Sequence, residues 1–121
     1  FKKLNNYFSS FSKFFKLPEV YKGVKTPWLA FPLVVKKNKK FTRKDLQIFL
    51  EKNNIQTRTI FSGNILKQPL MKNKFFKKNK LCSKVANDVM KNGILIGSHH
   101  GMKDKELKYI FATFDKFLNK K

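Results

Sequence analysis

Two adjacent histidines are the side chains of this sequence that most clearly suggest chemistry. His99 and His100 follow a short apolar run, where a strand would end, and strand-end loops often carry binding or proton-transferring groups. Neighbouring residues of an extended segment point to opposite sides, and no Cys/His motif at zinc spacing accompanies this pair. Two interpretations stay open: an imidazole that hydrogen-bonds or transfers a proton at a cleft, and ordinary turn histidines.

A single arginine interrupts the apolar pattern of residues 55–61, which are rich in β-branched side chains and predict a strand. The guanidinium of this residue, Arg58, matches carboxylate or phosphate geometry and makes it a candidate anion-binding residue. The alternative is an arginine that extends from an exposed sheet face into water. Arg43 lies at a predicted helix start and is interpreted as a surface residue.

Directly after this predicted strand comes Ser62-Gly63-Asn64, followed by Gln68-Pro69. Gly63 allows an unusual backbone angle and close backbone approach, and the Asn64 amide could hydrogen-bond a ligand. The alternative is an ordinary turn, since Gly and Asn favour turns. The chain shows no glycine-rich phosphate motif, no paired carboxylates and no partner for Cys82 as a nucleophile. We therefore identify no catalytic residue and no metal site, and the chain alone does not contain a complete active site.

The net charge of +21 at first suggests a nucleic-acid-binding protein. Of the 28 basic residues, however, only Arg43 and Arg58 are arginine, whose planar group reads bases and phosphates better than lysine does. The chain has 14 Phe and 11 Asn but only 3 Ala, a bias typical of A/T-rich codons. We interpret most of the lysine as a solvated surface, which makes the persistence of Arg58 more informative.

Several protein classes are excluded by what the sequence lacks. No apolar run of about 18 residues predicts a membrane span, and no secretory signal is visible. One cysteine cannot form an internal disulfide framework, which fits a reducing cytoplasm. The first residue is Phe rather than Met, so we expect a processed chain or a piece of a longer protein.

The elements that must position these residues follow from periodicity and from the placement of Pro, Gly and capping residues. Apolar spacing of three and four residues predicts a helix over 1–16 that ends before Pro18. Thr42, with Asp45 three residues later, predicts a capped helix that ends near 53–54. Further helices are expected at 84–92, capped by Ser83, and at 103–119; strands are expected at 28–36, 55–61 and 94–98, with 65–80 irregular.

Three strands alternating with four helices predict an α+β fold, a small sheet of about three strands covered by helices. Pro32 cannot donate to a sheet ladder, so residues 28–36 should form an edge strand or break there. The first and last helices are rich in Phe. We expect one of these Phe-rich faces to dock onto something outside this chain, because a small domain buries so many large side chains poorly.

The run from Thr57 to Pro69 resembles the C-terminal domain of the DegT/DnrJ/StrS class of pyridoxal-phosphate sugar enzymes. It is most similar to sugar-nucleotide 3-dehydrases of the CDP-4-keto-6-deoxyglucose type used in lipopolysaccharide synthesis. Those enzymes carry a similar Thr-Arg, then a Phe-x-Gly-Asn-Leu stretch, then Arg-Gln-Pro. Two features depart from the pattern: Lys67 stands where Arg is common, and residues 97–102 look like the Gly-Asn-His-His form of related dehydrases. These departures leave the nucleotide and the sugar open. The other matching segments are Leu17-Pro18, 27–32, 41–46, 86–90 and Ile96-Gly97.

The resemblance implies a fold-type-I enzyme in which residues 17–121 are the small C-terminal domain. Residues 1–16 would be the helix that leads in from a large cofactor-binding domain. In such dehydrases a His replaces the usual cofactor-linking Lys, and the cofactor works as pyridoxamine phosphate. Pyridoxal phosphate or pyridoxamine phosphate would be bound mainly by the large domain, and some members also carry an iron–sulfur cluster there.

The resemblance also implies what this chain contributes, which is substrate enclosure and dimer contacts in a cytoplasmic enzyme. It implies a sugar nucleotide, a homodimer and a reductase as partners, with no membrane and no specific nucleic acid. Two alternatives remain: a sugar-nucleotide aminotransferase of the same family, and a small basic nucleic-acid-binding protein. The candidate residues on the substrate or cofactor side are Arg58, Gly63, Asn64, His99 and His100.

Overall fold

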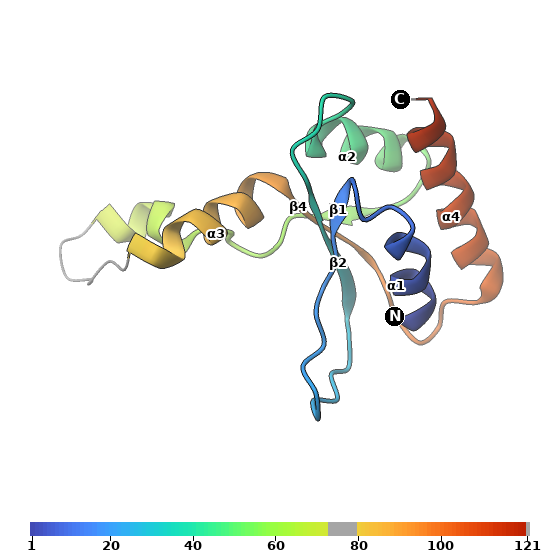
Figure 1. The fold of residues 1–121 in the computed structure, drawn as a ribbon, viewed down its shortest axis with the longest axis horizontal. Coiled ribbons are helices and arrows are strands. Elements are labelled where there is room, and N and C mark those ends of the chain that lie inside the picture. The colour runs from blue at the N-terminus through green and yellow to red at the C-terminus, as the bar shows by residue number, and fades with distance from the viewer. Residues whose placement is uncertain (73–79, 121) are drawn as a thin grey trace.

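A four-stranded antiparallel sheet, with helices against it, forms the centre of the molecule in a computed structural model (Figure 1). The structure describes residues 1–72 and 80–120, with side chains for residues 1–71 and 84–120. Helices α1, α2 and α4 lie on one side of the sheet, and α3 extends away on the other. The elements are α1 (Lys2–Ser9), β1 (Phe15–Lys16), β2 (Ala30–Val35), α2 (Arg43–Lys52), β3 (Thr57–Arg58), η1 (Ile65–Lys67), η2 (Pro69–Lys72), α3 (Lys80–Asn92), β4 (Gly93–Gly97) and α4 (Asp104–Asn119).

The sheet order β1-β2-β4-β3 confirms the α+β prediction and adds a fourth strand to the three expected. The additional strand, β1, arises because the first helix ends at Ser9 rather than at residue 16. Serines weaken a helix interior, since their hydroxyls bond to nearby backbone, as Ser9 does to the Asn6 carbonyl at 2.6 Å. The chain then turns, and Phe15 pairs with Val35. The prediction of helix over residues 10–16 is therefore wrong.

The prediction that residues 28–36 form an edge strand or break at Pro32 is wrong for the strand as a whole, because β2 runs unbroken between β1 and β4. Pro32 nevertheless lies where β2 has a local edge. It pairs with Leu95 of β4, whereas β1 covers β2 only at Val34 and Val35. Among the described strands, β2 therefore has a neighbour on one side alone at Pro32. A proline is tolerated there because no ladder hydrogen bond is required from its nitrogen.

The core lies between the sheet and the helices α1 and α4, which lie side by side (Figure 1). Phe8 of α1 is fully buried, and its ring centroid lies 4.8 Å from that of Phe114 and 5.5 Å from that of Phe31. The Tyr7 hydroxyl donates to the Phe111 carbonyl at 2.9 Å and to Asp115 at 2.8 Å, and burial raises the pKa of Tyr7 well above its usual value. The Phe-rich stripes thus pack against each other and the sheet, so the prediction that one of them docks elsewhere is wrong.

Local signals place α2 and α4 well and α3 less well. Thr42 and Asp45 form the predicted capping box at the start of α2. By contrast, α3 begins at Lys80, so position 83 lies inside the helix instead of capping it. The side chains of Cys82 and Ser83 lie outside the described residues, as does most of the segment 73–80.

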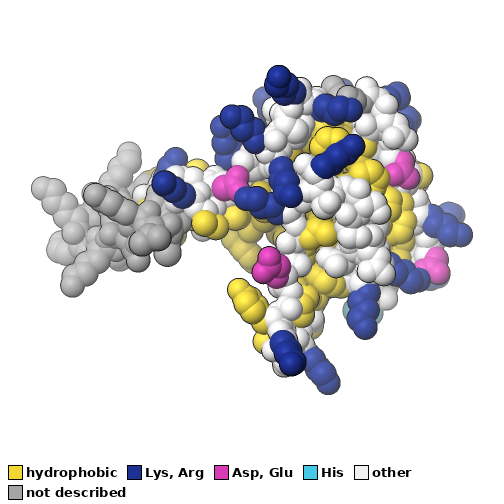
Figure 2. Space-filling view, viewed as in Figure 1, with side chains coloured by type: hydrophobic (Ala, Val, Ile, Leu, Met, Phe, Trp, Pro, Cys, Tyr) yellow, Lys and Arg dark blue, Asp and Glu magenta, His cyan; other side chains and the backbone are white. Residues whose placement is uncertain are grey.

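Lysine and arginine side chains are spread over the face shown in Figure 2 instead of gathering over one element. Two ion pairs join distant elements in the described part of the chain: Lys3 with Asp104 at 2.5 Å and Lys16 with Asp88 at 2.8 Å. Both pairs are largely exposed, and such pairs stabilise a fold by about 0–1 kcal/mol. Across residues 1–72 and 80–120, none of the helices has both the length and the apolar character needed to cross a membrane.

Candidate functional site

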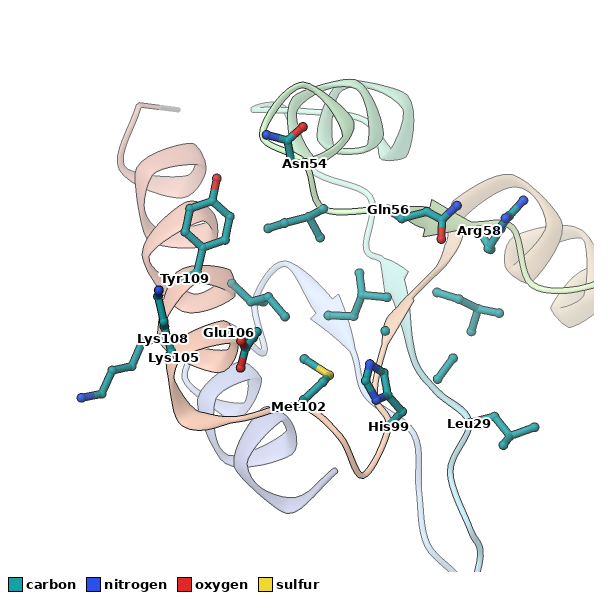
Figure 3. Close-up of a pocket in the computed structure, with 16 residues that line it drawn as sticks. Leu29, Asn54, Gln56, Arg58, His99, Met102, Lys105, Glu106, Lys108 and Tyr109 are labelled. Carbon is teal, nitrogen blue, oxygen red and sulfur yellow. The ribbon is translucent and has the colours of Figure 1, made fainter.

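A groove of about 900 Å³ opens between the sheet edge and the first half of α4 (Figure 3). It exists because β3 is only two residues long and pairs with β4 only at Ile96 and Leu95. On the β3 side the end of β4 is therefore left without a neighbouring strand, although β2 pairs with it on the other side, and α4 forms the facing wall. A volume of this size, lined mainly by apolar side chains with a few polar groups, is typical of a small-molecule site.

Arg58 and His99, two of the five candidate residues, line this groove. They come from sequence positions about forty residues apart, and the antiparallel pairing of β3 with β4 brings their segments together. Figure 3 places the two side chains at different parts of the groove, with Arg58 at the end of β3 and His99 beyond the end of β4. The fold thus brings both residues to the lining of one groove, at separate places along it.

The two arginines of the chain differ in how their guanidinium groups are used. Arg43 donates from Nε to the Lys91 carbonyl at 3.1 Å and from a terminal nitrogen to Gln47 at 2.7 Å, so it joins α2 to the end of α3. Within the described residues Arg58 makes no hydrogen bond or ion pair, and its charge acts on the nearby Glu51 carboxylate. The N–H donors of the Arg58 guanidinium are exposed, and no acceptor in the described residues bonds to them. An anion-binding role requires such available donors.

The two histidines have separate surroundings. His99 Nδ1 accepts a hydrogen bond from the Gly101 backbone N–H at 3.2 Å, so a neutral ring carries its proton on Nε2. His100 is exposed and lies outside the groove lining, with its ring at 85° to that of His99 and the centroids 6.4 Å apart. Across the part of the chain that the structure describes, no three His, Cys, Asp or Glu side chains gather as a metal site would need.

Gly63 and Asn64 hold the turn after β3, away from the groove. Gly63 has a φ of +64°, and its missing side chain lets Met90 of α3 pack directly on the backbone. The buried Asn64 amide donates to Asn87 at 2.9 Å and accepts from the Leu66 N–H at 2.9 Å. These contacts use the Asn64 side chain to fix the turn, so its role in the described residues is structural support.

Besides Glu106 at the start of α4, five polar residues of the lining were not singled out by sequence reasoning. Two lie just before β3, where exposure alternates strictly from residue 54 to residue 58 around buried Ile55 and Thr57. That alternation was a usable signal, because a period of two places alternate side chains on one face. The others lie on α4 beside its apolar stripe and have the pattern of an ordinary solvated helix face. The five are Asn54, Gln56, Lys105, Lys108 and Tyr109.

Glu51 holds the start of β3 in place. One of its carboxylate oxygens accepts hydrogen bonds from the Thr57 hydroxyl and the Thr57 N–H, both at 2.7 Å. These contacts lower the pKa of Glu51 below its ordinary value of 4.5. The hydrogen bond from the Thr57 hydroxyl is the largest cause, the hydrogen bond from the Thr57 N–H is the second, and the positive charge of Arg58 adds to both. The segment that carries Arg58 is thus tied to the end of α2 by a charged acceptor.

This link predicts a specific dependence of stability on pH. Because the pKa of Glu51 is lower in the folded chain, its stabilisation is complete above pH 4.5 and is lost as the pH falls through the folded value. We expect Glu51→Gln to flatten the acid limb of a plot of the free energy of unfolding against pH, measured by urea denaturation. Thr57→Val, which removes only the hydroxyl donor, should flatten it less. An unchanged acid limb in Glu51→Gln would contradict the link.

Comparison with known proteins places these features in a family context. The sequence model described as the DegT/DnrJ/EryC1/StrS aminotransferase family matches residues 2–115. The chain is 29% identical over 119 residues to lipopolysaccharide biosynthesis protein RfbH of Salmonella typhimurium strain LT2, covering 97% of this chain and 26% of that protein. It is 28% identical over 111 residues to dTDP-4-dehydro-2,6-dideoxy-D-glucose 3-dehydratase of Saccharopolyspora spinosa, covering 86% and 23%. The chain thus spans about a quarter of the length of these relatives.

Solved structures share the fold. An E. coli GDP-4-keto-6-deoxy-D-mannose-3-dehydratase with bound hydrated PLP matches with a TM-score of 0.71 and 24% identity, over 93% of this chain and 29% of that one. A DegT DnrJ EryC1 StrS aminotransferase from Brucella abortus matches with a TM-score of 0.75 and 14% identity, over 96% and 29%. At these identities the likeness establishes the small α+β architecture.

Proposed function

Because this chain belongs to the DegT/DnrJ/EryC1/StrS aminotransferase family, we propose that it is the C-terminal part of a sugar-nucleotide 3-dehydrase. The reaction would remove the C3 hydroxyl of a 4-keto-6-deoxy sugar nucleotide with pyridoxal or pyridoxamine phosphate, for lipopolysaccharide or O-antigen synthesis. The observation that carries the proposal is the 29% identity, over 97% of the chain, to a lipopolysaccharide biosynthesis protein. The name of the second curated relative, a 3-dehydratase, supports the same reaction.

A sugar-nucleotide aminotransferase is the second candidate. The family description itself names aminotransferases, and an aminotransferase structure matches this fold as well as a dehydratase structure does. The two activities would differ at the cofactor anchor, where the resemblance implies His in a dehydrase and Lys in an aminotransferase. That anchor would lie in the large domain, outside this chain.

This chain would enclose the substrate and take part in dimer contacts. Arg58 and His99 fit the anionic and hydroxyl groups of a sugar nucleotide, because they present unpaired donors along one groove. His100, Gly63 and Asn64 would act around this site, the last two by holding the turn after β3. The same proposal includes a cytoplasmic homodimer in which residues 1–16 lead in from the large domain.

The cofactor would be held mainly by the large domain. Among the described residues, the groove offers cations and an imidazole that suit a phosphate-bearing partner, but we assign none of them as its anchor. When bound, pyridoxamine phosphate supplies the electron sink for removal of the C3 hydroxyl. A reductase partner and an iron–sulfur cluster in the large domain are further parts of the proposal.

The reaction can be tested with the enzyme that contains this chain, incubated with CDP-, GDP- or dTDP-linked 4-keto-6-deoxy sugars. Pyridoxamine phosphate is supplied in one series, with and without a reductase that delivers two electrons, and pyridoxal phosphate with glutamate is supplied in another. Mass spectrometry separates loss of the C3 hydroxyl from gain of an amino group. We expect the deoxygenated sugar; an amino sugar as the sole product would support the aminotransferase, and no product in either series would contradict both.

The two arginines provide a matched pair of variants. Arg58→Lys should leave the free energy of unfolding within about 0.5 kcal/mol, as for other exposed sites. In the same enzyme it should lower kcat/KM by about tenfold or more, since lysine cannot reproduce a bidentate contact to an anion. Arg43→Lys should do the reverse and lower the free energy of unfolding by about 1 kcal/mol by losing its two hydrogen bonds. Equal kinetics in both variants would remove Arg58 from the site.

A further inference from the structure

The groove carries a row of polar side chains that the protein itself does not use. Asn54, Gln56 and Arg58 are exposed, while Ile55 and Thr57 between them are buried. The side chains of Gln56 and Arg58 therefore share one face of the chain as it enters β3, about 7 Å apart. Asn54 precedes them in a turn, with a φ of +56°. Within the described residues none of these three side chains makes a hydrogen bond, so two amides and a guanidinium are available to a ligand.

The backbone beneath this row is held firmly. Glu51 accepts two hydrogen bonds from Thr57, and the Tyr109 hydroxyl donates to the Asn53 carbonyl at 3.0 Å. The second contact joins α4 to the segment that leads into β3 across the end of the groove. A preorganised row of this kind loses little entropy when it binds a ligand.

The facing wall, on α4, combines an aromatic ring with positive charge. The half-exposed ring of Tyr109 is fixed by its hydroxyl contact, and Lys105 and Lys108 stand at the rim (Figure 3). The acid in the lining is Glu106, whose carboxylate accepts from the Lys103 N–H at 2.8 Å as part of the helix cap. The groove therefore presents an apolar floor, free amides, one clamped aromatic ring and a rim of cations.

We propose that this groove is a nucleobase-binding subsite, with the base between the Tyr109 wall and the Gln56 amide and the phosphates at the cationic rim. A base is planar and apolar on its faces and carries donors and acceptors on its edge, which an amide can read. A diphosphate matches the positive charge of the α4 lysines at the rim, which lie across the groove from Arg58 (Figure 3). The inference rests on the proposed function, since it assigns one part of a sugar nucleotide to named residues of this chain.

Free nucleotides provide the test, with the 121-residue chain as it stands. CDP, GDP, UDP and dTDP are titrated by isothermal calorimetry, beside inorganic pyrophosphate and ribose 5-phosphate, which lack a base. We expect at least one nucleoside diphosphate to bind about tenfold more tightly than pyrophosphate, since stacking of one base contributes that much or more. Tyr109→Ala should remove this difference, and Tyr109→Phe, which keeps the ring, should retain most of it.

Gln56→Ala supplies a second test that does not depend on the α4 contact, because Gln56 is exposed and makes no hydrogen bond within the described residues. It should reduce the preference among the four bases and leave pyrophosphate binding unchanged. Lys22→Ala, in the exposed loop outside the groove, controls for general attraction to a basic chain. Circular dichroism of each variant confirms that the fold is retained.

The outcomes separate this inference from the proposed function. Equal binding of nucleotides and pyrophosphate, unaffected by Tyr109→Ala and Gln56→Ala, would overturn the base subsite and leave the dehydrase proposal standing. Absence of any nucleotide binding would also overturn the subsite, since every residue assigned to it lies in this chain. The dehydrase proposal itself fails only if the enzyme that contains the chain forms no deoxygenated sugar.

Discussion

Phe8→Ala is expected to lower the free energy of unfolding by about 3–5 kcal/mol, the range found for Phe truncation in a packed core. The Phe8 side chain is 0% exposed, and its ring contacts those of Phe15, Phe31 and Phe114. These partners come from β1, β2 and α4, so a cavity at Phe8 would weaken three elements of the fold together. Urea denaturation followed by circular dichroism measures the change.

A second phenylalanine provides the control for this experiment. Phe61 is 89% exposed, and its truncation should change the free energy of unfolding by less than about 0.5 kcal/mol. The comparison also tests the packing of α1. A loss below about 1 kcal/mol for Phe8→Ala would mean that α1 is loosely attached, and the original expectation that its Phe face docks elsewhere would be restored.

Gly63→Ala is expected to lower the free energy of unfolding by about 2–5 kcal/mol. Left-handed backbone costs a side-chain-bearing residue about 1–2 kcal/mol, and forced overpacking costs about 1–3 kcal/mol more. Both apply here, because φ is +64° and an added Cβ would overlap Met90 Cγ, lie 2.5 Å from Met90 Cβ and lie 3.0 Å from Met90 Cα. The last of these atoms is backbone, so the helix α3 itself would have to move.

Gly23→Ala is the matched control, because Gly23 has a φ of +81° with nothing within 4 Å of an added Cβ. It should lower the free energy of unfolding by about 1 kcal/mol, from the backbone angle alone. The double variant Gly63→Ala/Met90→Ala should recover part of the loss relative to Met90→Ala. Equal losses at Gly63 and Gly23 would show that the contact between α3 and the turn contributes nothing.

The features that could be predicted from sequence are those formed within a few residues of chain. The capping box of α2 joins Thr42 to Asp45, three residues apart, and it is present as predicted. The central strands and α4 were also located to within two or three residues, because each has its own periodicity. The run from Thr57 to Pro69 was enough to indicate the family, which the match over residues 2–115 confirms.

The features that could not be predicted depend on partners far apart in the chain. Phe11 and Phe15 fit a helical stripe as well as a turn and a strand, and only pairing of Phe15 with Val35 decides between them. Tyr7 is placed by Asp115, 108 residues away, and the Phe-rich faces are buried by each other. A local pattern states that a face is apolar, but it does not state what will cover that face.

The candidate site divides in the same way. Sequence alone determined that Arg58 was an exceptional residue in a lysine-rich chain, and that His99 ended a strand. Only the tertiary structure decided that Arg43 is bonded to the protein while Arg58 is free within the described residues, and that Asn64 supports a turn. The groove itself has no sequence signature, because it results from a two-residue strand that leaves the end of β4 uncovered on the β3 side, opposite α4. Such a space is set by where the elements stop relative to one another, and that is a property of the packed fold.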